Sequence, residues 1–500
     1  MMKLSNRHCL VVRLAALTFA AGLPVLPVTD ARDANAAEAS RPNIVFAIAD
    51  DWGWPHAGAY GDAVVKTPTF DRLAREGALF HHAYVSSPSC TPSRGAALTG
   101  QWHWRLEGAG NLWSVFPDKF ATYPELLRAA GYQVGVSGKG WGPGRTETPG
   151  RELAGKRFGS FQAFLSQRQK DKPFCFWLGS SDPHRPYQKG SGAAAGMDLD
   201  RVHLFDCFPD CKEVRGDVAD YYFEVQRFDR LVGAALASLE AIGELGNTLV
   251  LMTGDNGMPF PRCKSNIYDT GTRMPLAVRW PGHVKAGRTV DDFVSFTDFA
   301  PTLLEVAGVE PHPRMTGRSL VGVFRSKKSG RVDPARDFVL TGKERHCPAQ
   351  EAPDMGGYPC RAIRTHEYLY IRNFRPDRWP AGTPDYRKAA WSGAWYADCD
   401  NSPTKTYMID NRQKDEKHKR LYELAFGKRP AEELYDLAKD PQQLDNVAAD
   451  SQYAEVRRKL AERLTAQLEA TGDPRVVGGG EEFDLYPYLG GAPKYPGPTN

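Results

Sequence analysis

The segment Asn43–Ala49 reads NIVFAIA and is followed directly by Asp50 and Asp51. A continuous apolar run of this length predicts a strand that is buried on both faces, as in a parallel sheet. The segment Thr248–Thr253 (TLVLMT) has the same character and also runs into polar residues. Since polar groups past the carboxyl ends of parallel strands form the binding edge of an α/β fold, we expect the site at this edge.

Further strands and helices are expected between and around these two runs. The apolar patterns predict two further strands, over Gln133–Ser137 and Pro173–Leu178. They predict helices over Thr69–Glu76, Glu125–Ala130 and Asp220–Ile242. Strands that alternate with helices predict an α/β fold with a large, mostly parallel mixed sheet flanked by helices.

The composition changes after about residue 341, where Pro, Gly, Trp and Tyr become frequent. Short, hairpin-like strands are predicted over Cys360–Thr365 and Tyr368–Asn373, and a polar helix over Glu455–Ala470. We therefore predict a first domain over residues 41–340 and a smaller α+β subdomain with a short antiparallel sheet and a helix over residues 341–500.

The N-terminus has the layout of a secretory signal peptide over residues 1–36. Three basic residues precede an apolar stretch at about Leu14–Val28, and Ala34–Ala36 supplies a small-x-small cleavage pattern. No later stretch reaches the ~18 apolar residues that a membrane-spanning helix needs. The sequence thus predicts an exported protein, periplasmic or extracellular, without stable membrane association after signal cleavage.

The overall composition excludes some classes of partner. Hydrophobic residues at 41% and charged residues at 25% are ordinary for a globular enzyme. The formal net charge is +4, with 64 basic residues spread among 60 acidic ones. Because a nucleic-acid-binding protein concentrates basic residues on one face, we expect no nucleic-acid partner.

Nine cysteines are present, of which one lies in the predicted signal peptide and Cys90 is discussed below. Seven remain, an odd number, so at least one is unpaired within the chain. Cys207 and Cys211 are close enough to bridge, and so are Cys347 and Cys360. No second Cys/His pair with zinc-ligand spacing follows Cys211, so we expect a disulfide there or no bond.

The most specific motif lies at residues 90–94, which read CTPSR, with LTG at residues 98–100. A lone cysteine among such residues could be inert, but Cys-x-Pro-Ser-Arg followed by Leu-Thr-Gly resembles the maturation signature of the formylglycine-dependent (type I) sulfatase family, in the alkaline phosphatase superfamily. The resemblance implies that Cys90 is oxidised to formylglycine (3-oxoalanine) by a formylglycine-generating maturation enzyme. The domain over residues 41–340 would then be the sulfatase catalytic domain.

The resemblance also implies why such a residue is needed. Sulfate esters hydrolyse slowly, and a covalent nucleophile divides the reaction into easier steps. One hydroxyl of the hydrated aldehyde attacks sulfur, and the second, once deprotonated, restores the aldehyde and expels sulfate. A sulfated serine or cysteine has no second hydroxyl that could expel the sulfate in this way.

The strand-end residues match the metal site of this family. Asp50, Asp51, Asp255 and Asn256 offer three carboxylates and an amide oxygen, and the diol from Cys90 completes the set. Taken singly, such residues are more often solvated strand ends or turns. Oxygen ligands of this kind suit Ca²⁺ or Mg²⁺, and the family resemblance favours Ca²⁺.

Three cations and one histidine resemble the remaining catalytic residues of the family. Arg94, Lys139 and Lys264 correspond to its cationic clamp on the diol and the sulfo oxygens. His184 corresponds to the histidine that protonates the leaving group. By itself, Lys139 could be a surface lysine and His184 a solvated loop residue.

The chain departs from the family pattern at Trp141, where the family usually has a histidine two positions after its strand-end lysine. His103 is a candidate for that role, and otherwise the metal and Lys139 must suffice. A second departure is Lys264, where the mammalian sulfamidase pattern has arginine. We therefore include His103 and Trp141 among the candidate substrate-site residues.

The resemblance extends from Arg41 to the segment Glu433–Leu437 and to Asn446. Residues 255–261, DNGMPFP, look most like the heparan N-sulfatase (sulfamidase) branch, which implies a sulfated saccharide substrate. Whether the linkage is O-sulfo or N-sulfo stays open. Arg345 and His346 are candidates to hold neighbouring anionic groups of the saccharide. Four aromatic residues could stack on sugar rings, or could equally pack the subdomain against the large one: Trp379, Trp391, Trp395 and Tyr396.

Other functions remain to be distinguished. Some relatives with the same cysteine motif and metal scaffold are phosphodiester or phosphonate monoester hydrolases, and the motif alone does not separate sulfur from phosphorus. The DNGMPFP stretch favours a sulfatase. Trp141 in place of histidine would suit a catalytically silent carbohydrate-binding relative. The complete set of catalytic residues and metal ligands argues against a silent relative and also against an exported scaffold protein. The catalytic residues of this set are Cys90, Arg94, Lys139 and His184.

Overall fold

The computed structural model describes residues 41–497. The predicted signal peptide over residues 1–36 lies outside the described residues. The described residues belong to one compact unit. Within residues 41–497, no helix is both long enough and apolar enough to cross a membrane.

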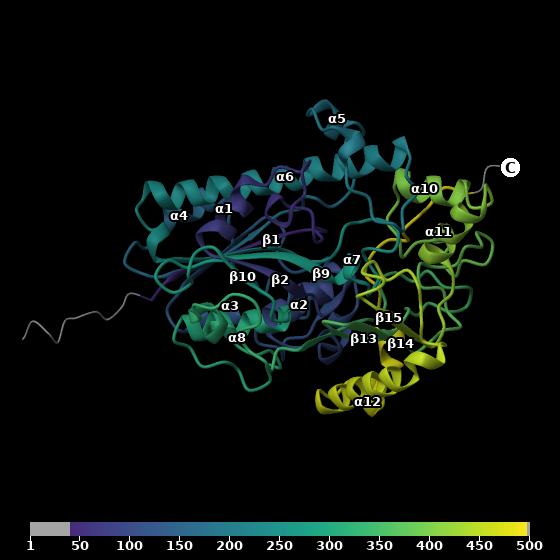
Figure 1. Cartoon of the computed structure of the whole chain (residues 1–500). Coiled ribbons are helices and arrows are strands. Elements are labelled where there is room, and N and C mark those ends of the chain that lie inside the picture. Colours follow the sequence, from purple (N-terminus) through teal and green to yellow (C-terminus); the bar gives the residue numbers. More distant parts are fainter. Residues whose placement is uncertain (1–40, 498–500) are drawn as a thin grey trace, which may run out of the picture. The chain divides into compact units, whose positions relative to one another are not determined.

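A large sheet runs through the centre of the described part of the chain (Figure 1). Its strand order is β10-β2-β9-β8-β1-β7-β4-β6, with β11 pairing β2. All of its neighbouring strands are parallel except that β9 is antiparallel to β2 and β8. The strands are β1 (Asn43–Ala49), β2 (Ala78–Tyr84), β4 (Gln133–Ser137), β6 (Lys156–Arg157), β7 (Phe174–Gly179), β8 (Thr248–Gly254), β9 (Arg273–Arg279), β10 (Arg288–Val290) and β11 (Val294–Ser295). The predicted mostly parallel mixed sheet is confirmed.

Helices cover both faces of this sheet (Figure 1). One face carries α1 (Pro68–Glu76), α4 (Phe161–Gln167) and α6 (Lys212–Ala241). The other face carries α2 (Cys90–Thr99), α3 (Tyr123–Ala129) and α8 (Phe299–Val306). Shorter elements complete this part: β3 (Ser114–Phe116), β5 (Gly144–Thr146), α5 (Ser191–Ala194), α7 (Asp269–Thr272) and α9 (Val321–Arg325).

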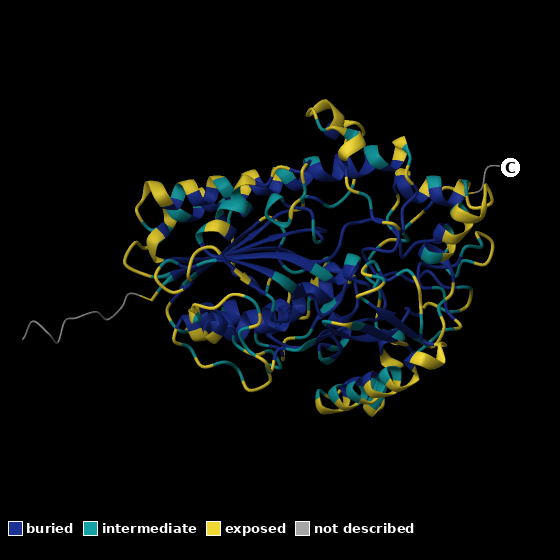
Figure 2. Ribbon diagram, viewed as in Figure 1, coloured by how far each residue is buried: buried dark blue, intermediate teal, exposed yellow. Residues whose placement is uncertain are grey.

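Strand β1 shows why the apolar runs form the centre of the sheet. Ile44, Phe46 and Ile48 pack in the core on one face, while Val45 and its alternating neighbours pack in the core on the other. Successive side chains of a strand point to opposite faces, so a strand covered on both sides needs an unbroken apolar run. Figure 2 shows the central strands as buried. Truncation of Phe46 to Ala would destabilise the fold by about 3–5 kcal/mol.

The C-terminal part contains a four-stranded antiparallel sheet, β12 (Phe338–Lys343), β13 (Cys360–Thr365), β14 (Tyr368–Asn373) and β15 (Glu432–Asp436). Helix α12 (Ala454–Ala470) packs on it through Leu460, Leu464 and Leu468, which recur every four residues and so share one helix face. The expected smaller subdomain with an antiparallel sheet and a helix is confirmed. The remaining helices are α10 (Pro403–Asp410), α11 (Glu416–Phe426), α13 (Pro474–Val477) and α14 (Glu482–Leu485).

Short 3-10 helices connect these elements. They are η1 (Gly58–Tyr60), η2 (His103–Arg105), η3 (Glu107–Gly110), η4 (Leu199–Arg201), η5 (Leu245–Asn247), η6 (Phe296–Asp298) and η7 (Ser451–Tyr453). Helix α6 begins at Lys212, whereas the sequence predicted a start at Asp220. Val214 and Val218 lie in the first and second turns of the helix and are buried, so tertiary packing supports the additional turns. The proposed cysteine pairs do not form, since every cysteine among the described residues is free.

Candidate active site at the carboxyl edge of the large sheet

Two neighbouring parallel strands place four polar residues at one point of the sheet edge. Ala49 at the end of β1 is in register with Gly254 at the end of β8. The residues that follow each strand, Asp50 with Asp51 and Asp255 with Asn256, are therefore brought together. The backbone of Asp51 has φ +72°, and its N–H donates to Asp255 Oδ1 at 2.9 Å. The left-handed turn at Asp51 ends the strand and keeps the residues that follow β1 in contact with those that follow β8.

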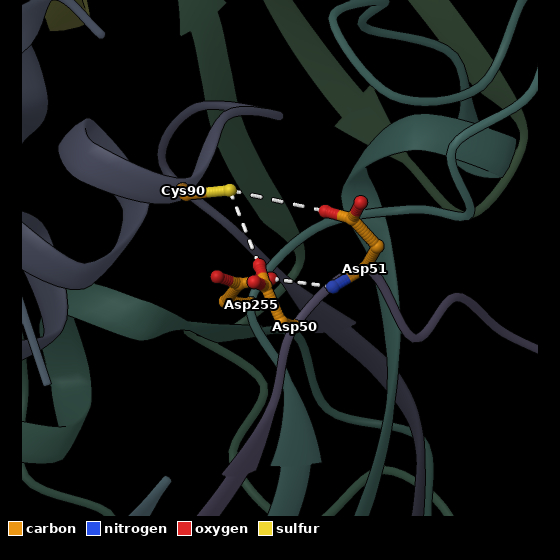
Figure 3. Close-up of side chains that lie close together, drawn as sticks. All are labelled: Asp50, Asp51, Cys90 and Asp255. Carbon is orange, nitrogen blue, oxygen red and sulfur yellow. Dashed lines mark hydrogen bonds between the residues drawn. The ribbon is translucent and has the colours of Figure 1, made fainter. Parts of the chain in front are cut away.

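Helix α2 brings Cys90 to these carboxylates. Cys90 is the first residue of α2, and its Sγ lies 3.2 Å from Asp50 Oδ1 and 3.8 Å from Asp51 Oδ1. Figure 3 shows the sulfur directed at both carboxylates, with Asp255 beside them. One ligand atom from each of these four buried residues lies within 4.8 Å of the others. The predicted nucleophile position and the predicted carboxylates thus form one cluster.

Burial keeps the Cys90 side chain neutral in the unmodified chain. Removal from water, with the Asp50 carboxylate as the next cause, raises the pKa of Cys90 well above its usual value. A thiolate is the nucleophilic form of cysteine, so an unmodified Cys90 is a poor nucleophile at neutral pH. Without an ion in the cluster, the surroundings of Cys90 favour the thiol over the thiolate.

Three cations balance the three carboxylates. Lys139 Nζ lies 2.6 Å from Asp50 Oδ2, and Lys264 Nζ lies 2.8 Å from Asp51 Oδ2. Burial by itself would raise the pKa of Asp50, but Lys139 and the other nearby cations outweigh it and lower that pKa well below its usual range. The nearby cations thus favour the ionised form of Asp50, and the pair tolerates burial because the two charges compensate each other.

Arg94 balances the third carboxylate. Its Nε lies 2.6 Å from Asp255 Oδ2, and both side chains are fully buried. The guanidinium also donates to the carbonyls of Ala49, Lys139 and Gly140. Arg94 does not line the cavity described below. The guanidinium fixes Asp255 and the backbone that carries Lys139, and the predicted clamp of Arg94 on the diol and the sulfo oxygens stays a prediction.

The residues present fit a divalent cation that prefers oxygen ligands. Asn256 donates through Nδ2 to Asp51 Oδ1 at 2.7 Å and to the carbonyl of Gly257. Its Oδ1 is buried and has no hydrogen-bond partner among the described residues. A buried acceptor without a partner is costly unless a cation or donor completes it. Together with the carboxylates of Asp50, Asp51 and Asp255, this oxygen makes a hard-donor set suited to Ca²⁺ or Mg²⁺.

His184 follows strand β7 and approaches the same cluster. Its Nδ1 lies 2.5 Å from the carbonyl of Arg185, and its Nε2 lies 3.9 Å from Asp51 Oδ2. Because a carbonyl only accepts, Nδ1 carries the proton and Nε2 is the nitrogen that faces the site. The ring is partly exposed and lines the cavity. This is the position that a proton donor to a leaving group requires.

A cavity of about 610 Å³ opens above the cluster. It is lined by Asp50, Cys90, Lys139, Trp141, His184 and Lys264 from the large sheet and its loops, and by His346, Cys347, Cys399, Asp400, Asn401, Tyr488 and Lys494 from the C-terminal part. Both parts of the chain therefore build one site. Its size suits one sugar ring with its substituents.

The structure separates the predicted substrate residues into two groups. Trp141 and His346 line the cavity, and His346 Nδ1 is hydrogen-bonded to the Ser89 hydroxyl at 2.8 Å. His103 does not line it, because the ring is fully buried and its Nδ1 binds the Ser86 hydroxyl. Arg345 does not line it either, since its guanidinium donates to the carbonyls of two residues in and after α14. The predictions for His103 and Arg345 are thus not supported by their positions.

The aromatic residues that were predicted to contact sugar lie elsewhere. None of Trp379, Trp391, Trp395 and Tyr396 is among the cavity-lining residues. Trp395 and Tyr396 are buried, where they pack against each other and against Tyr495. The alternative, that these side chains pack the C-terminal part, holds for this pair.

Sequence reasoning missed several residues of the C-terminal wall of the cavity. Asp400 lies 3.6 Å from Lys264 and lines the cavity beside Asn401. Burial would raise the pKa of Asp400, but Lys264 and other cations lower it well below its usual range. Tyr488 and Lys494 come from the last described segment. The only local signal was the polar stretch of residues 398–401, DCDN, which follows no strand and so resembled an ordinary loop.

Comparisons with known proteins agree with this geometry. A family model described as sulfatase matches residues 42–156 and 156–309, and one described as N-sulphoglucosamine sulphohydrolase, C-terminal, matches residues 262–379. The human N-sulphoglucosamine sulphohydrolase is 29% identical over 489 residues, which cover 87% of this chain and 92% of that protein. An ulvan-active sulfatase of Formosa agariphila is 27% identical over 482 residues, which cover 87% of this chain and 76% of that protein.

Solved structures share the fold. One that holds its substrate D-glucosamine-2-N,6-O-disulfate has a TM-score of 0.58 at 21% identity and covers 87% of this chain and 99% of its own. The phosphonate monoester hydrolase of Agrobacterium radiobacter has a TM-score of 0.60 at 19% identity and covers 87% of this chain and 97% of its own. The match of the sulfatase model to more than half of the sequence, on a fold with these features, is decisive. The chain belongs to the sulfatase family.

Proposed function

We propose that this sulfatase is exported and hydrolyses a sulfate ester or sulfamate on a carbohydrate, with a glycosaminoglycan-type saccharide carrying N-sulfated glucosamine as the first candidate. The observation that supports this most is the position of Cys90, whose sulfur lies among the carboxylates of Asp50, Asp51 and Asp255 at the floor of a sugar-sized cavity. Lys139 and the other cations surround the same point. Such an arrangement suits attack on an anionic group.

Two groups that the family implies would complete the chemistry. Formylglycine formed from Cys90 would supply, as its hydrate, a hydroxyl nucleophile at the position that the Cys90 sulfur occupies. A Ca²⁺ ion, or Mg²⁺, held by Asp50, Asp51, Asp255 and Asn256 supplies positive charge that polarises a sulfo group.

The side chains of the chain itself divide the remaining work. Lys139 and Lys264 both line the cavity and orient the sulfo oxygens. Lys139 is paired with Asp50, and Lys264 with Asp51. His184, with Nδ1–H held by the Arg185 carbonyl, directs Nε2 into the cavity; in the imidazolium form, Nε2–H gives its proton to the leaving oxygen or nitrogen and the ring becomes neutral. Arg94 is a positioning residue because it holds Asp255 and the backbone carbonyl of Lys139 without reaching the cavity.

The candidate substrate rests on similarity in the region that lines the cavity. The N-sulphoglucosamine sulphohydrolase C-terminal model spans Lys264 and His346, both of which face the cavity. The human relative is named for N-sulphoglucosamine, and the solved structure cited above holds a glucosamine disulfate. These relatives favour N-sulfoglucosamine as the first compound to test, ahead of a phosphonate or phosphodiester.

The test is release of inorganic sulfate from a panel of N-sulfoglucosamine, its O-sulfated isomers and ulvan oligosaccharides, with a phosphodiester as control. The full chain is co-expressed with a formylglycine-generating enzyme, and mass spectrometry confirms the aldehyde at position 90. We expect sulfate from at least one saccharide and none from Cys90→Ala, whereas Cys211→Ala, at a half-buried cysteine outside the cavity, should keep the activity. Product from the phosphodiester alone would refute the proposal.

A further inference from the structure

A second cavity adjoins the first and shares part of its wall. It has a volume of about 460 Å³ and is lined by residues of β4, β5 and β6 and of the loops between them. Gly140, Trp141 and Arg157 line both cavities. Trp141, the residue that departs from the family pattern, therefore stands at the boundary between the reaction cavity and a neighbouring space. That space is not needed to hold one sulfated sugar.

The indole of Trp141 is held in place by its neighbours. Its ring meets Phe116 edge to face, with the centroids 5.2 Å apart. A Cβ on Gly144 would lie 2.9 Å from the Trp141 ring and 2.4 Å from the carbonyl oxygen of Ser114, so only glycine fits beside the indole. The side chain remains partly exposed. A fixed, partly exposed aromatic face is a suitable support for a sugar ring.

Two arginines give the second cavity a positive charge. Arg145 and Arg157 line it, are exposed, and have no ion pair among residues 41–497. Arg157 is oriented by a hydrogen bond from Nη1 to the Gly138 carbonyl at 2.6 Å. By contrast, Arg151 in the same cavity is already neutralised by Glu125, at 2.7 Å.

Acidic groups do not cancel this charge. Among the described residues that line the second cavity, the one carboxylate is Glu152, and it lies 3.3 Å from Arg128. Lys494, on the rim of the first cavity, is likewise exposed and has no ion pair among residues 41–497. The two joined cavities therefore offer more unpaired cations than the single sulfo group at Cys90 requires.

We propose that the second cavity is a subsite for a second anionic group, sulfo or carboxylate, on a neighbouring sugar of the same saccharide. The sugar chain crosses the face of Trp141, and Arg145 and Arg157 bind the second anion by charge-assisted hydrogen bonds. This inference rests on the proposed function, because it assumes a sulfated carbohydrate at Cys90. It makes the substrate an anionic oligosaccharide of two or more residues.

The test compares affinities for a long and a short ligand in a chain that cannot turn over. Full-length Cys90→Ala is titrated by calorimetry with a heparin-derived tetrasaccharide and with N-sulfoglucosamine. The arginine variant Arg145→Ala, at a residue that lines only the second cavity, should bind the tetrasaccharide about three-fold more weakly and the monosaccharide with unchanged affinity. Addition of Arg157→Ala, in the wall that the two cavities share, should weaken tetrasaccharide binding to about ten-fold in total. Lys285→Ala with Lys327→Ala removes the same charge from exposed sites outside both cavities and should change neither affinity.

Further arms identify the anion and the role of the indole. A tetrasaccharide without O-sulfo groups keeps its affinity if the carboxylate is bound, and loses it if a sulfo group is bound. Trp141→Ala should weaken tetrasaccharide binding about ten-fold, and Trp141→Phe should restore most of it. Equal affinities for the two ligands in the parent chain, or a parallel loss of both in the arginine variant, would overturn the proposal. Failure of the proposed function is recognised separately, by the absence of sulfate release from any saccharide.

Discussion

The reaction cavity has two walls that differ in origin and in charge balance. The strand-edge wall consists of Asp50, Lys139, His184 and Lys264, which follow strands or loops of the large sheet. The C-terminal wall consists of His346, Asp400, Asn401, Tyr488 and Lys494, which lie on segments outside helices and strands. In the strand-edge wall the carboxylate and both lysines are paired at 2.6–2.8 Å. In the C-terminal wall, Lys494 has no ion pair among residues 41–497.

This difference follows from burial. An unpaired charge in the interior is strongly unfavourable, so charges next to the sheet core must be paired. Charges on exposed loops remain solvated until a ligand arrives, and loops can change without disturbing the core. We therefore expect changes in the strand-edge wall to affect stability and the chemical step, and changes in the C-terminal wall to affect substrate affinity.

The largest effect on stability is expected from Arg94→Met. This substitution leaves the Asp255 carboxylate buried without its partner at 2.6 Å, and so should lower the free energy of unfolding by about 3–5 kcal/mol. Urea denaturation measures the change. Arg157→Met, the same substitution at an exposed arginine, should change the free energy by less than about 0.5 kcal/mol. Equal losses in the two variants would contradict the division between paired and exposed charges.

Binding of Ca²⁺ should stabilise the chain through the carboxylate cluster beneath the strand-edge wall. At a Ca²⁺ concentration about 100 times the dissociation constant, the free energy of unfolding of the metal-stripped protein should rise by about 2.7 kcal/mol. Asp51→Asn should abolish this gain, because Asp51 belongs to the ligand cluster. Asp400→Asn serves as the matched control in the C-terminal wall and should keep it. A gain that persists in Asp51→Asn would place the ion elsewhere.

Acid should weaken the contact between the large sheet and the C-terminal sheet. Asp269 beside β9 forms two hydrogen bonds of 3.0 Å with Arg364 of β13. Burial acts to raise the pKa of Asp269, but Arg364 outweighs it and lowers the pKa from 3.8 to about 2. Because the folded-state pKa is depressed, this pair stabilises the fold fully above about pH 4, and the contribution is lost as the pH falls to about 2.

Protonation of Asp269 should lower the free energy of unfolding by on the order of 2 kcal/mol. This loss is measured as the difference in unfolding free energy between the natural chain and Asp269→Asn, followed from pH 6 to pH 2. The difference should shrink as the pH falls. A difference that is constant across this range would show that the Asp269 charge contributes nothing.

The smallest effect is expected from Asp400→Asn. Asp400 is 3.6 Å from Lys264 and its side chain is 24% exposed, so its substitution should cost less stability than that of the fully buried Arg94. The carboxylate is placed to accept hydrogen bonds from sugar hydroxyls, so KM should rise by up to about ten-fold with kcat nearly unchanged. Steady-state kinetics on the responding saccharide measures both. A fall in kcat with constant KM would assign Asp400 to the chemical step.

The centre of the fold could be predicted because its signals are local. The predicted strands Asn43–Ala49 and Gln133–Ser137 coincide with β1 and β4, and Thr248–Thr253 differs from β8 by one residue. A strand buried on both faces must be apolar throughout, which is visible in a single segment. The antiparallel strand β9, between β2 and β8, was not predicted. Its place depends on partners that are remote in the sequence, and periodicity does not report them.

For the candidate site, too, the sequence predicts the place of some residues and misplaces others. The CTPSR motif and the strand-end carboxylates could be found from the sequence, because parallel strands bring their carboxyl ends to one edge. The same reasoning assigned His103 and Arg345 to the site, although both are buried against other partners. A residue type in a loop does not indicate which way its side chain points once the loop packs.

The sequence by itself therefore determined the central strands, the cysteine motif and the polar residues at the strand ends, since each depends on a few neighbouring residues. Only the tertiary structure decided that Arg94 is enclosed behind the site, that Asp400 approaches Lys264, and that Trp141 lies between two cavities. These contacts join segments far apart in the chain. Their formation depends on the packing of irregular loops on the sheet edge, for which no local pattern exists.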